Sequence, residues 1–322
     1  MYLDFFGLSA KPFQLTADPR FLYPSKAHSR AIAYLSYGLS QAEGFIVITG
    51  DIGTGKTTLV KNLFSEIDSS RLTAAQLVTT QVDDFDLMKL INAAFRLEYK
   101  GLAKGDLLQQ FQAFLEAEAA QGKRVLLVID EAQNLPIRTL EELRMLSNYE
   151  VDGKPMLQCF LLGQKEFRIT IGSPQLKQLR ERVIASTGLQ PLSKQDTQLY
   201  TNHRLTLCGW KDDPQIEQAA HDSVYQITGG IPRKINLLWD RIFLYACLEE
   251  VHRIDESLVA AVEAEMAEER YSETAVEEHT FSVKENEDIH GRLAALESVA
   301  LSLAKDYKEF SIKVRETILR DQ

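Results

Sequence analysis

The chain has 322 residues and a formal net charge of −10, with 45% hydrophobic and 25% charged residues. This length suggests two domains, or one domain with extensions, and the composition supplies ample material for a core. No apolar run approaches the roughly 20 residues that span a bilayer. The N-terminus lacks the basic and then apolar order of a signal peptide, so we expect a cytoplasmic protein. Three scattered cysteines without metal-ligand spacing are typical of buried thiols in a reducing compartment: Cys159, Cys208 and Cys247.

The negative charge is concentrated late in the chain. Residues 249–290 contain 14 acidic and three basic residues, a net charge of −11, so the rest of the chain carries about +1. A solvated helix and linker account for this segment. The near-neutral remainder does not demand a nucleic-acid partner, although it leaves room for a local basic face.

The first 44 residues are rich in aromatic residues and turn signals such as Asp18-Pro19 and Tyr23-Pro24. A helical pattern follows from His28 to Leu39. Residues 50–57 match G-x-x-x-x-G-K-[ST], the motif of a phosphate-binding loop, and in ATPases with such a loop the segment before the first strand often lines the adenine pocket. Four side chains are candidates for that role here, although packing against the core would explain them equally well: Phe21, Leu22, Tyr23 and His28.

The stretch from Phe45 to Phe64 organises the rest of the chain. Residues 45–48 form a β-branched apolar run, which predicts a strand buried on both faces. Residues 50–57 then match G-x-x-x-x-G-K-[ST], and residues 59–64 have helical spacing. An ordinary glycine turn before a helix is the alternative, but strand, glycine loop and helix together are the context that a phosphate-binding loop requires.

The residue types in this loop suit a polyphosphate. Glycines let the backbone curl with its N–H groups inward, and the start of a helix favours an anion. Lys56 can reach the β- and γ-phosphates, and the Thr57 hydroxyl can join a Mg²⁺ shell. We therefore expect ATP and Mg²⁺ as ligands. The predicted nucleotide-binding residues of the loop are Gly50, Asp51, Ile52, Gly53, Thr54, Gly55, Lys56, Thr57 and Thr58.

A second nucleotide signature lies at residues 125–131, after a predicted strand at 75–80 and predicted helices at 86–96 and 106–120. Five apolar residues precede Asp130 and Glu131, which is the Walker B pattern. We expect this strand to lie beside the P-loop strand, so that Asp130 holds Mg²⁺ through its waters, facing Thr57. Glu131 is then placed to polarise the attacking water. An apolar strand that ends in a capping acid is the alternative.

Further elements complete the predicted sheet. Residues 139–149 predict a helix, and residues 157–163 a fourth strand that ends at Gln164, where a sensor of the γ-phosphate would stand. Residues 176–184 predict a helix that carries Arg180 and Arg182, and residues 189–192 a short fifth strand that leaves the domain.

Residues 193–270 have an all-helical pattern, with helices predicted at 194–208, 215–227 and 257–266. Gly229 and Gly230 break the chain before a helix that begins near Pro232. Arg233 at its start can project back toward the nucleotide, although a surface arginine is the alternative. Residues 271–285 read as a linker, and residues 286–322 carry a heptad pattern over about four repeats. That helix should pair with a second copy, with a partner or with its own body.

Six segments together resemble the general secretion pathway protein A family of AAA+ ATPases. They are YLDFFGLSAKPFQLTADPRFLY, GDIGTGKTT, VLLVIDEAQNL, LLGQKEF, LRERV and TGGIPRKIN, all within about residues 1–270. The likeness is closest to the secretion-type ATPases of exosortase exopolysaccharide loci. The departures are a Gln at the sensor 1 position, and a linker and heptad helix where the secretion members carry a membrane span and a periplasmic part.

The resemblance implies a P-loop AAA+ αβα sandwich with a five-stranded parallel sheet (residues 1–192), a helical lid (193–270), an acidic linker (271–285) and a coiled-coil helix (286–322). Gln164 takes the sensor 1 role and Arg233 the sensor 2 role. Arg182, with Arg180 as the alternative, becomes the arginine finger that acts on a neighbouring subunit, worth about 10³–10⁵ in rate.

The expected protein is thus a Mg·ATP-hydrolysing ATPase that assembles as a homo-oligomer, ring or filament. It would serve envelope export from the cytoplasm, reaching the inner membrane through its partners. Two alternatives stay open: a DNA-binding regulator like the transposition ATPases, and a nucleotide-gated scaffold with negligible turnover.

Overall fold

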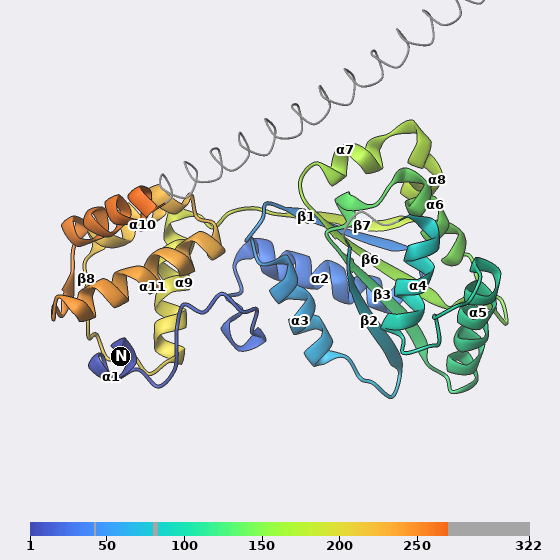
Figure 1. Ribbon diagram of the computed structural model, residues 1–322, viewed down its shortest axis with the longest axis horizontal. Helices are drawn as coiled ribbons and strands as arrows, with labels where there is room; N and C mark the ends of the chain where they lie inside the picture. The colour runs from blue at the N-terminus through green and yellow to red at the C-terminus, as the bar shows by residue number, and fades with distance from the viewer. Residues whose placement is uncertain (42, 80–82, 270–322) are drawn as a thin grey trace, which may run out of the picture. The chain divides into compact units, whose positions relative to one another are not determined.

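The computed structural model describes residues 1–41, 43–79 and 83–269 (Figure 1). Its centre is a five-stranded parallel sheet with the order β2-β3-β6-β1-β7. This confirms the predicted fold class of a five-stranded parallel sheet with helices on its faces. The strands are β1 (Phe45–Gly50), β2 (Leu72–Val78), β3 (Arg124–Asp130), β6 (Leu157–Gly163) and β7 (Val183–Leu189).

Each face of the sheet is covered by its own set of helices (Figure 1). One core packs Val47, Leu127 and Leu161 against the first set, and the other packs Ile48 and Phe160 against the second. The alternation along each strand follows from the period of two in a pleated strand, and both faces are apolar because both are buried. The first set is α4 (Asp84–Ala94), α5 (Lys104–Ala120), α6 (Ile137–Leu146), α7 (Phe167–Gly172) and α8 (Lys177–Glu181); the second is α2 (Lys26–Gln41) and α3 (Lys56–Glu66).

The strand order corrects one prediction. We expected β3 to lie beside β1, but β6 lies between them and pairs with both. The order of strands in a sheet depends on how the connections between strands cross over, and not on local residue patterns. The sequence around Asp130 therefore does not show which strand lies beside β3. The consequence is that Gln164, at the end of β6, stands between the P-loop and Asp130.

The last strand of the sheet also differs from its prediction. The helix expected over residues 176–184 ends at Glu181, and Val183 and Ile184 already belong to β7. The strand that we predicted to begin at residue 189 therefore begins six residues earlier, at Val183. The β-branched pair Val183-Ile184 fits a strand better than a helix. The other predicted helices and strands of the sheet domain are present, with ends shifted by up to three residues.

The chain beyond the sheet is mostly helical. Its elements are α9 (Lys194–Leu207), α10 (Gln218–Thr228) and α11 (Pro232–Leu248), and residues 256–269 are helical. The all-helical prediction missed a small parallel pair, β8 (Gln215–Ile216) with β9 (Arg253–Ile254). Each strand has two residues, too few to leave a periodic signal. We call residues 194–248 the helical subdomain.

The N-terminal segment, residues 1–25, is called the strap below. Its short helix α1 (Tyr2–Phe5) lies against α11, where Tyr2 donates a hydrogen bond to Asp240 and contacts Phe243. Phe13 is fully buried and stacks on Trp239. The strap is thus anchored on the helical subdomain before η1 (Pro19–Phe21) leads it to α2.

The remaining elements are short: η2 (Ala132–Asn134), β4 (Glu150–Val151), β5 (Lys154–Pro155) and η3 (Pro174–Leu176). The predicted linker at 271–285 and heptad helix at 286–322 lie outside the described residues, as does Thr80 at the end of the strand predicted for residues 75–80.

Candidate nucleotide-binding site

The loop between β1 and α3 needs its glycines for two separate reasons. Gly53 and Gly55 have φ values of +84° and +98°, a region that favours glycine. A Cβ on Gly53 would meet the Cβ of Arg233 at 2.5 Å, and one on Gly55 would meet His28 Nε2 at 2.9 Å. The loop is therefore closely covered by α11 on one side and by α2 on the other.

Lys56 is the first residue of α3, directly after this loop, and it is buried. Its Nζ donates to the backbone oxygens of Gly50, at 2.8 Å, and Asp51, at 3.1 Å. Burial lowers the pKa of Lys56, and the nearby carboxylates, Glu131 foremost, oppose that shift. A buried ammonium whose N–H groups bind two carbonyl oxygens is well placed to donate hydrogen bonds to phosphate oxygens.

Thr57 of α3 and Asp130 at the end of β3 are in contact although β1, which leads into α3, is not a neighbour of β3. Thr57 Oγ1 donates to Asp130 Oδ2 at 2.9 Å, and Asp130 is 3% exposed. A hydroxyl oxygen beside a carboxylate is the donor set that Mg²⁺ prefers, with waters completing the shell. The residues present therefore fit a magnesium ion.

Glu131 begins a sharp turn at the end of β3, with φ of +55°. Its N–H donates to Asp130 Oδ1, and its Oε2 accepts from Gln133 Nε2 at 2.6 Å and from Gln164 Nε2 at 3.4 Å. Gln164 also donates its backbone N–H to Gln133 Oε1 at 3.0 Å. The structure thus brings Glu131 and Gln164 together, and Gln133 joins them.

Lys56, Thr57 and Glu131 line a cavity of about 290 Å³, whereas Asp130 and Gln164 do not line it. We call the part lined by Gly53, Gly55, Lys56, Thr57 and Glu131 its P-loop end. We call a second part its strap end; it is lined by residues 14–18 and 21–23 of the strap and by Leu192, Tyr200, Arg204, Pro232 and Asn236. All four of the predicted adenine-pocket candidates line this cavity.

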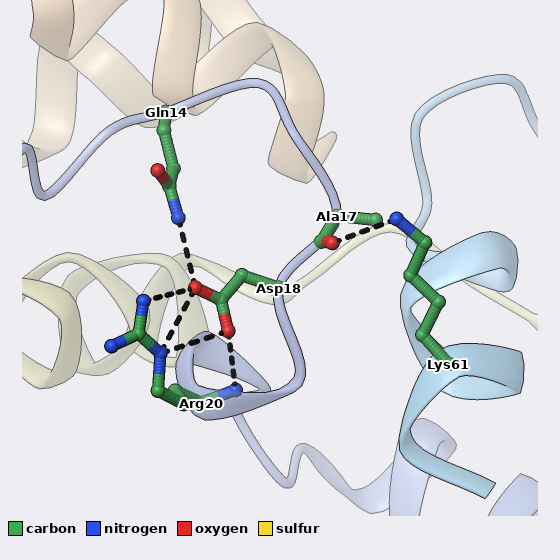
Figure 2. Close-up of polar contacts among 5 residues, drawn as sticks. All are labelled: Gln14, Ala17, Asp18, Arg20 and Lys61. Carbon is green, nitrogen blue, oxygen red and sulfur yellow. Dashed lines mark hydrogen bonds and ion pairs between the residues drawn. The ribbon is translucent and has the colours of Figure 1, made fainter. Parts of the chain in front are cut away.

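Polar contacts hold the strap over the P-loop helix (Figure 2). Lys61 of α3 donates from Nζ to the backbone oxygen of Ala17 at 3.0 Å. The Asp18 carboxylate accepts from the Gln14 amide and from Arg20, and the hydrogen bonds from Arg20 lower the pKa of Asp18 to about 2. This cluster fixes the turn that carries residues 14–18 along the cavity.

The helical subdomain contributes a chain of buried polar groups at the strap end. Tyr200 donates its hydroxyl to Asn236 Oδ1 at 2.8 Å and accepts from Arg204 Nη1 at 2.5 Å. The Arg204 guanidinium lies over the ring of Phe21, 4.6 Å from its centroid, and Asn236 donates to the backbone oxygen of Gln14 at 3.4 Å. These contacts tie α9 and α11 to the strap.

Tyr23 and His28 line the cavity in different ways. His28 is buried, its Nδ1 contacts Ser25 Oγ at 2.7 Å, and its Nε2 contacts the Thr54 carbonyl at 3.0 Å. Because a carbonyl oxygen only accepts, Nε2 carries the proton, and Nδ1 of the neutral ring accepts from Ser25. Tyr23 donates to Asp196 of α9 at 3.2 Å. His28 therefore supports the loop from behind, whereas Tyr23 joins the strap to the helical subdomain.

The three predicted arginines occupy different positions. Arg233 lines the cavity, and its N–H donates to the Gly53 carbonyl at 3.1 Å. Arg182 is exposed at the opposite end of β1, where its carbonyl accepts from Phe45 N. Arg180 directs Nη1 toward the carbonyls of residues 171–173, the nearest being Gly172 at 2.9 Å. Only Arg233 is close to the P-loop of its own chain.

The sequence analysis did not predict several contacts at this site. Lys165 pairs with Asp51 of the P-loop at 2.6 Å, and Gln133 contacts both Glu131 and Gln164. A weak signal existed for Gln133, because a polar residue two positions after the acid shares its strand-end loop. Nothing local marked Tyr200 or Asn236, since only the tertiary fold brings them to the strap.

Comparisons with known proteins found both a family match and a curated relative. Residues 39–171 match the family model for an AAA domain. The chain is 38% identical over 255 residues to the general secretion pathway protein A of Aeromonas hydrophila, a match that covers 79% of this chain and 46% of the relative. The chain thus spans about half the length of that relative.

Solved structures show the same fold. The Aeropyrum pernix ORC2 protein, in ADPNP and ADP complexes, matches with a TM-score of 0.63 at 17% identity, over 79% of this chain and 71% of that chain. Cdc6p of Pyrobaculum aerophilum matches with a TM-score of 0.58 at 17% identity, over 74% and 68%. At such identities the likeness shows the P-loop AAA fold alone. Within the described part of the chain, no helix has both the length and the apolar content that crossing a membrane requires.

Proposed function

We propose that this protein is an ATPase that hydrolyses Mg·ATP and serves secretion at the cell envelope. The observation that carries the proposal is the contact of Thr57 with Asp130 at 2.9 Å beside the buried Lys56, with Glu131 opening onto the same cavity. The proposed phosphate ligand Lys56, metal ligand Thr57 and base Glu131 line one end of a single cavity, and Asp130, the second proposed metal ligand, binds Thr57. The match to an AAA domain over residues 39–171 includes all four and supports the proposal.

ATP would lie along the cavity with its phosphates at the P-loop end. Backbone N–H groups of the loop and the start of α3 favour the phosphate charge, and Lys56 binds the β- and γ-phosphate oxygens. Thr57 and Asp130 would hold Mg²⁺, which when bound neutralises charge on the phosphate oxygens. The strap end would then receive the base and ribose.

Glu131 is the proposed general base. Its carboxylate takes a proton from water as the water oxygen bonds to the γ-phosphorus and the bond to the β–γ bridging oxygen breaks, which gives ADP and phosphate. Gln164 directly follows β6, which lies between β1 and β3, and its amide donates to Glu131 Oε2 at 3.4 Å; it is the proposed sensor of the γ-phosphate. Arg233, held against Gly53, is the proposed reporter to the helical subdomain.

Arg182 is the proposed arginine finger and acts in trans. It lies beside the start of β1 whereas the P-loop begins at its end. At about 3.3 Å per residue, this separation is on the order of 16 Å, so Arg182 cannot serve its own site. Arg180 is less suited because its guanidinium already binds carbonyl oxygens. A homo-oligomer would therefore be needed for fast turnover.

The role in export rests on the secretion relative, which is 38% identical over 79% of this chain. We further propose that the protein serves an exopolysaccharide export locus of the exosortase type. The heptad pattern at residues 286–322 would then bind a membrane-associated partner or a second copy of the chain.

The test is the substitution Glu131→Gln, which removes the base and keeps the shape. We expect unchanged ATP affinity by calorimetry and a turnover number lower by about 10²–10⁴. Glu166→Gln is the control, because it removes an exposed carboxylate that also acts on Lys56 but does not line the cavity. Turnover of Glu131→Gln at the parent rate would contradict the assignment.

A further inference from the structure

The side-chain amide of Gln133 connects the ends of two strands of the sheet. Gln133 lies in η2, just after β3, and Gln164 follows β6. The Gln133 Oε1 accepts from the backbone N–H of Gln164 at 3.0 Å, while its Nε2 donates to Glu131 Oε2 at 2.6 Å. Because a backbone N–H only donates and a carboxylate only accepts, this amide can adopt just one orientation.

The backbone around Glu131 is fixed independently of Gln133. Glu131 N–H donates to Asp130 Oδ1 at 3.0 Å, and Thr79 Oγ1 contacts the carbonyl oxygens of Asp130 and Glu131, both at 2.9 Å. The Glu131 side chain is held differently. Its hydrogen bonds to the amides of Gln133 and Gln164 both go to Oε2, which leaves Oε1 as the oxygen that can face a water.

We propose that Gln133 is a positioning residue for ATP hydrolysis. Its Nε2 holds Oε2 of Glu131, so that Oε1 is aimed at the water that attacks the γ-phosphorus and takes the proton from it. This inference rests on the proposed function and deepens it. Gln133 itself does not line the cavity, so it acts through Glu131 and not on the substrate.

The two halves of the amide have separable roles. The acceptor half ties η2 to β6 through Gln164 N–H and is structural. The donor half orients the base. Gln133→Glu keeps the acceptor, has nearly the same shape, loses the donor and places a like charge beside Glu131. Gln133→Met keeps the length and loses both halves.

The experiment measures steady-state ATP hydrolysis by the full chain and ADP affinity by calorimetry. We expect Gln133→Glu and Gln133→Met each to lower kcat by about 10- to 100-fold, since a misaligned base loses part of the 10²–10⁴ that a positioned one supplies. KM for ATP and the affinity for ADP should stay within about twofold of the parent. The control is Gln121→Met, which replaces an exposed amide directly after α5 that donates to the Ala117 carbonyl.

A double-mutant cycle gives the sharper readout. Adding Gln133→Glu to Glu131→Gln should change kcat by less than about twofold, because the group that Gln133 positions is already gone. A full 10-fold further loss in that background would overturn the inference, as would Gln133→Glu turning over at the parent rate. A parent chain that does not hydrolyse ATP would instead overturn the proposed function, and this inference with it.

Discussion

The two ends of the cavity are built in opposite ways. At the P-loop end, the groups come from one eight-residue loop and from Glu131, which directly follows β3. At the strap end, side chains from three distant segments converge, and the contact between Asn236 and Gln14 joins residues 222 positions apart. The first end is fixed by local residue types, whereas the second depends on the tertiary fold.

This difference predicts how each end responds to substitution. The P-loop end has few charged side chains, so replacing one of them should weaken phosphate binding strongly. A side-chain network should lose affinity in smaller steps and affect only the part of the ligand that it contacts. Comparing ATP with tripolyphosphate separates the two ends, because tripolyphosphate has no base or ribose.

The largest effect is expected for Lys56→Met at the P-loop end. The substitution keeps the aliphatic stem and removes the buried ammonium that binds Gly50 and Asp51. We expect the affinities for ATP and for tripolyphosphate both to fall by at least about 100-fold, because Lys56 is proposed to contact two phosphate groups and each charge-assisted contact is worth about 1.5–3 kcal/mol. Calorimetry measures both ligands, with the exposed Lys177→Met as control. A loss confined to ATP would contradict the placement of phosphates at this end.

A smaller and ligand-selective effect is expected for Tyr200→Phe at the strap end. The hydroxyl accepts from Arg204 and donates to Asn236, so its loss leaves two buried polar groups without that partner. This should lower the free energy of unfolding by about 1–3 kcal/mol. We expect ATP affinity to fall by about tenfold while tripolyphosphate affinity stays unchanged. Equal losses for both ligands would show that the two ends are not independent.

The same division explains what the sequence predicted. The strand, loop and helix around Lys56 and the apolar run before Asp130 are short-range patterns, so the sheet and the residues of the P-loop end could be predicted. The position of β6 between β3 and β1 could not be predicted, because the sequence of a strand does not show which strand pairs with it. The start of β7 at Val183 was missed since a helical pattern from residue 176 ran into it without a glycine or proline to mark the boundary.

The strap end shows the limit most clearly. The position of their segment before the P-loop strand gave Phe21, Leu22, Tyr23 and His28 as candidates, and all four line the cavity. Their partners Tyr200 and Asn236 lie on helices with ordinary amphipathic patterns, where a tyrosine or asparagine has no distinguishing spacing. Only the packing of α9 and α11 against residues 14–23 gives these side chains a role.

A pH-dependent effect is expected at His28, which supports the P-loop end. Burial lowers the pKa of His28 below its usual 6.5, so the unfolded chain binds a proton more readily than the folded one. Stability should therefore be fully present above about pH 6.5 and fall as the pH drops through that value toward the folded pKa. Protonation would also remove the acceptor that Ser25 uses.

The measurement is thermal unfolding of the parent and of His28→Gln between pH 7.5 and 5. The glutamine amide can keep the hydrogen bond to the Thr54 carbonyl without titrating, so the variant should lose less stability over this range. His221, whose pKa burial lowers to about 4, contributes to acid loss in both proteins and does not affect their difference. Identical pH profiles would show that His28 does not titrate with unfolding.

The smallest effect is expected for Lys61→Met, which tests whether the strap is held by α3. Lys61 is exposed, and its hydrogen bond to the Ala17 carbonyl is the contact between strap and P-loop helix that Figure 2 shows. An exposed hydrogen bond from a charged side chain contributes about 0.5–1 kcal/mol, so the free energy of unfolding should change by no more than that. The release rate of ATP should rise by about two- to fivefold, because the base is proposed to lie at the strap end, while the release of tripolyphosphate should not change. Stopped-flow release of the two ligands measures this, with Lys26→Met at the start of α2 as the matched control. Faster release of both ligands would place the effect of Lys61 on the P-loop helix itself and remove the distinction between the two ends.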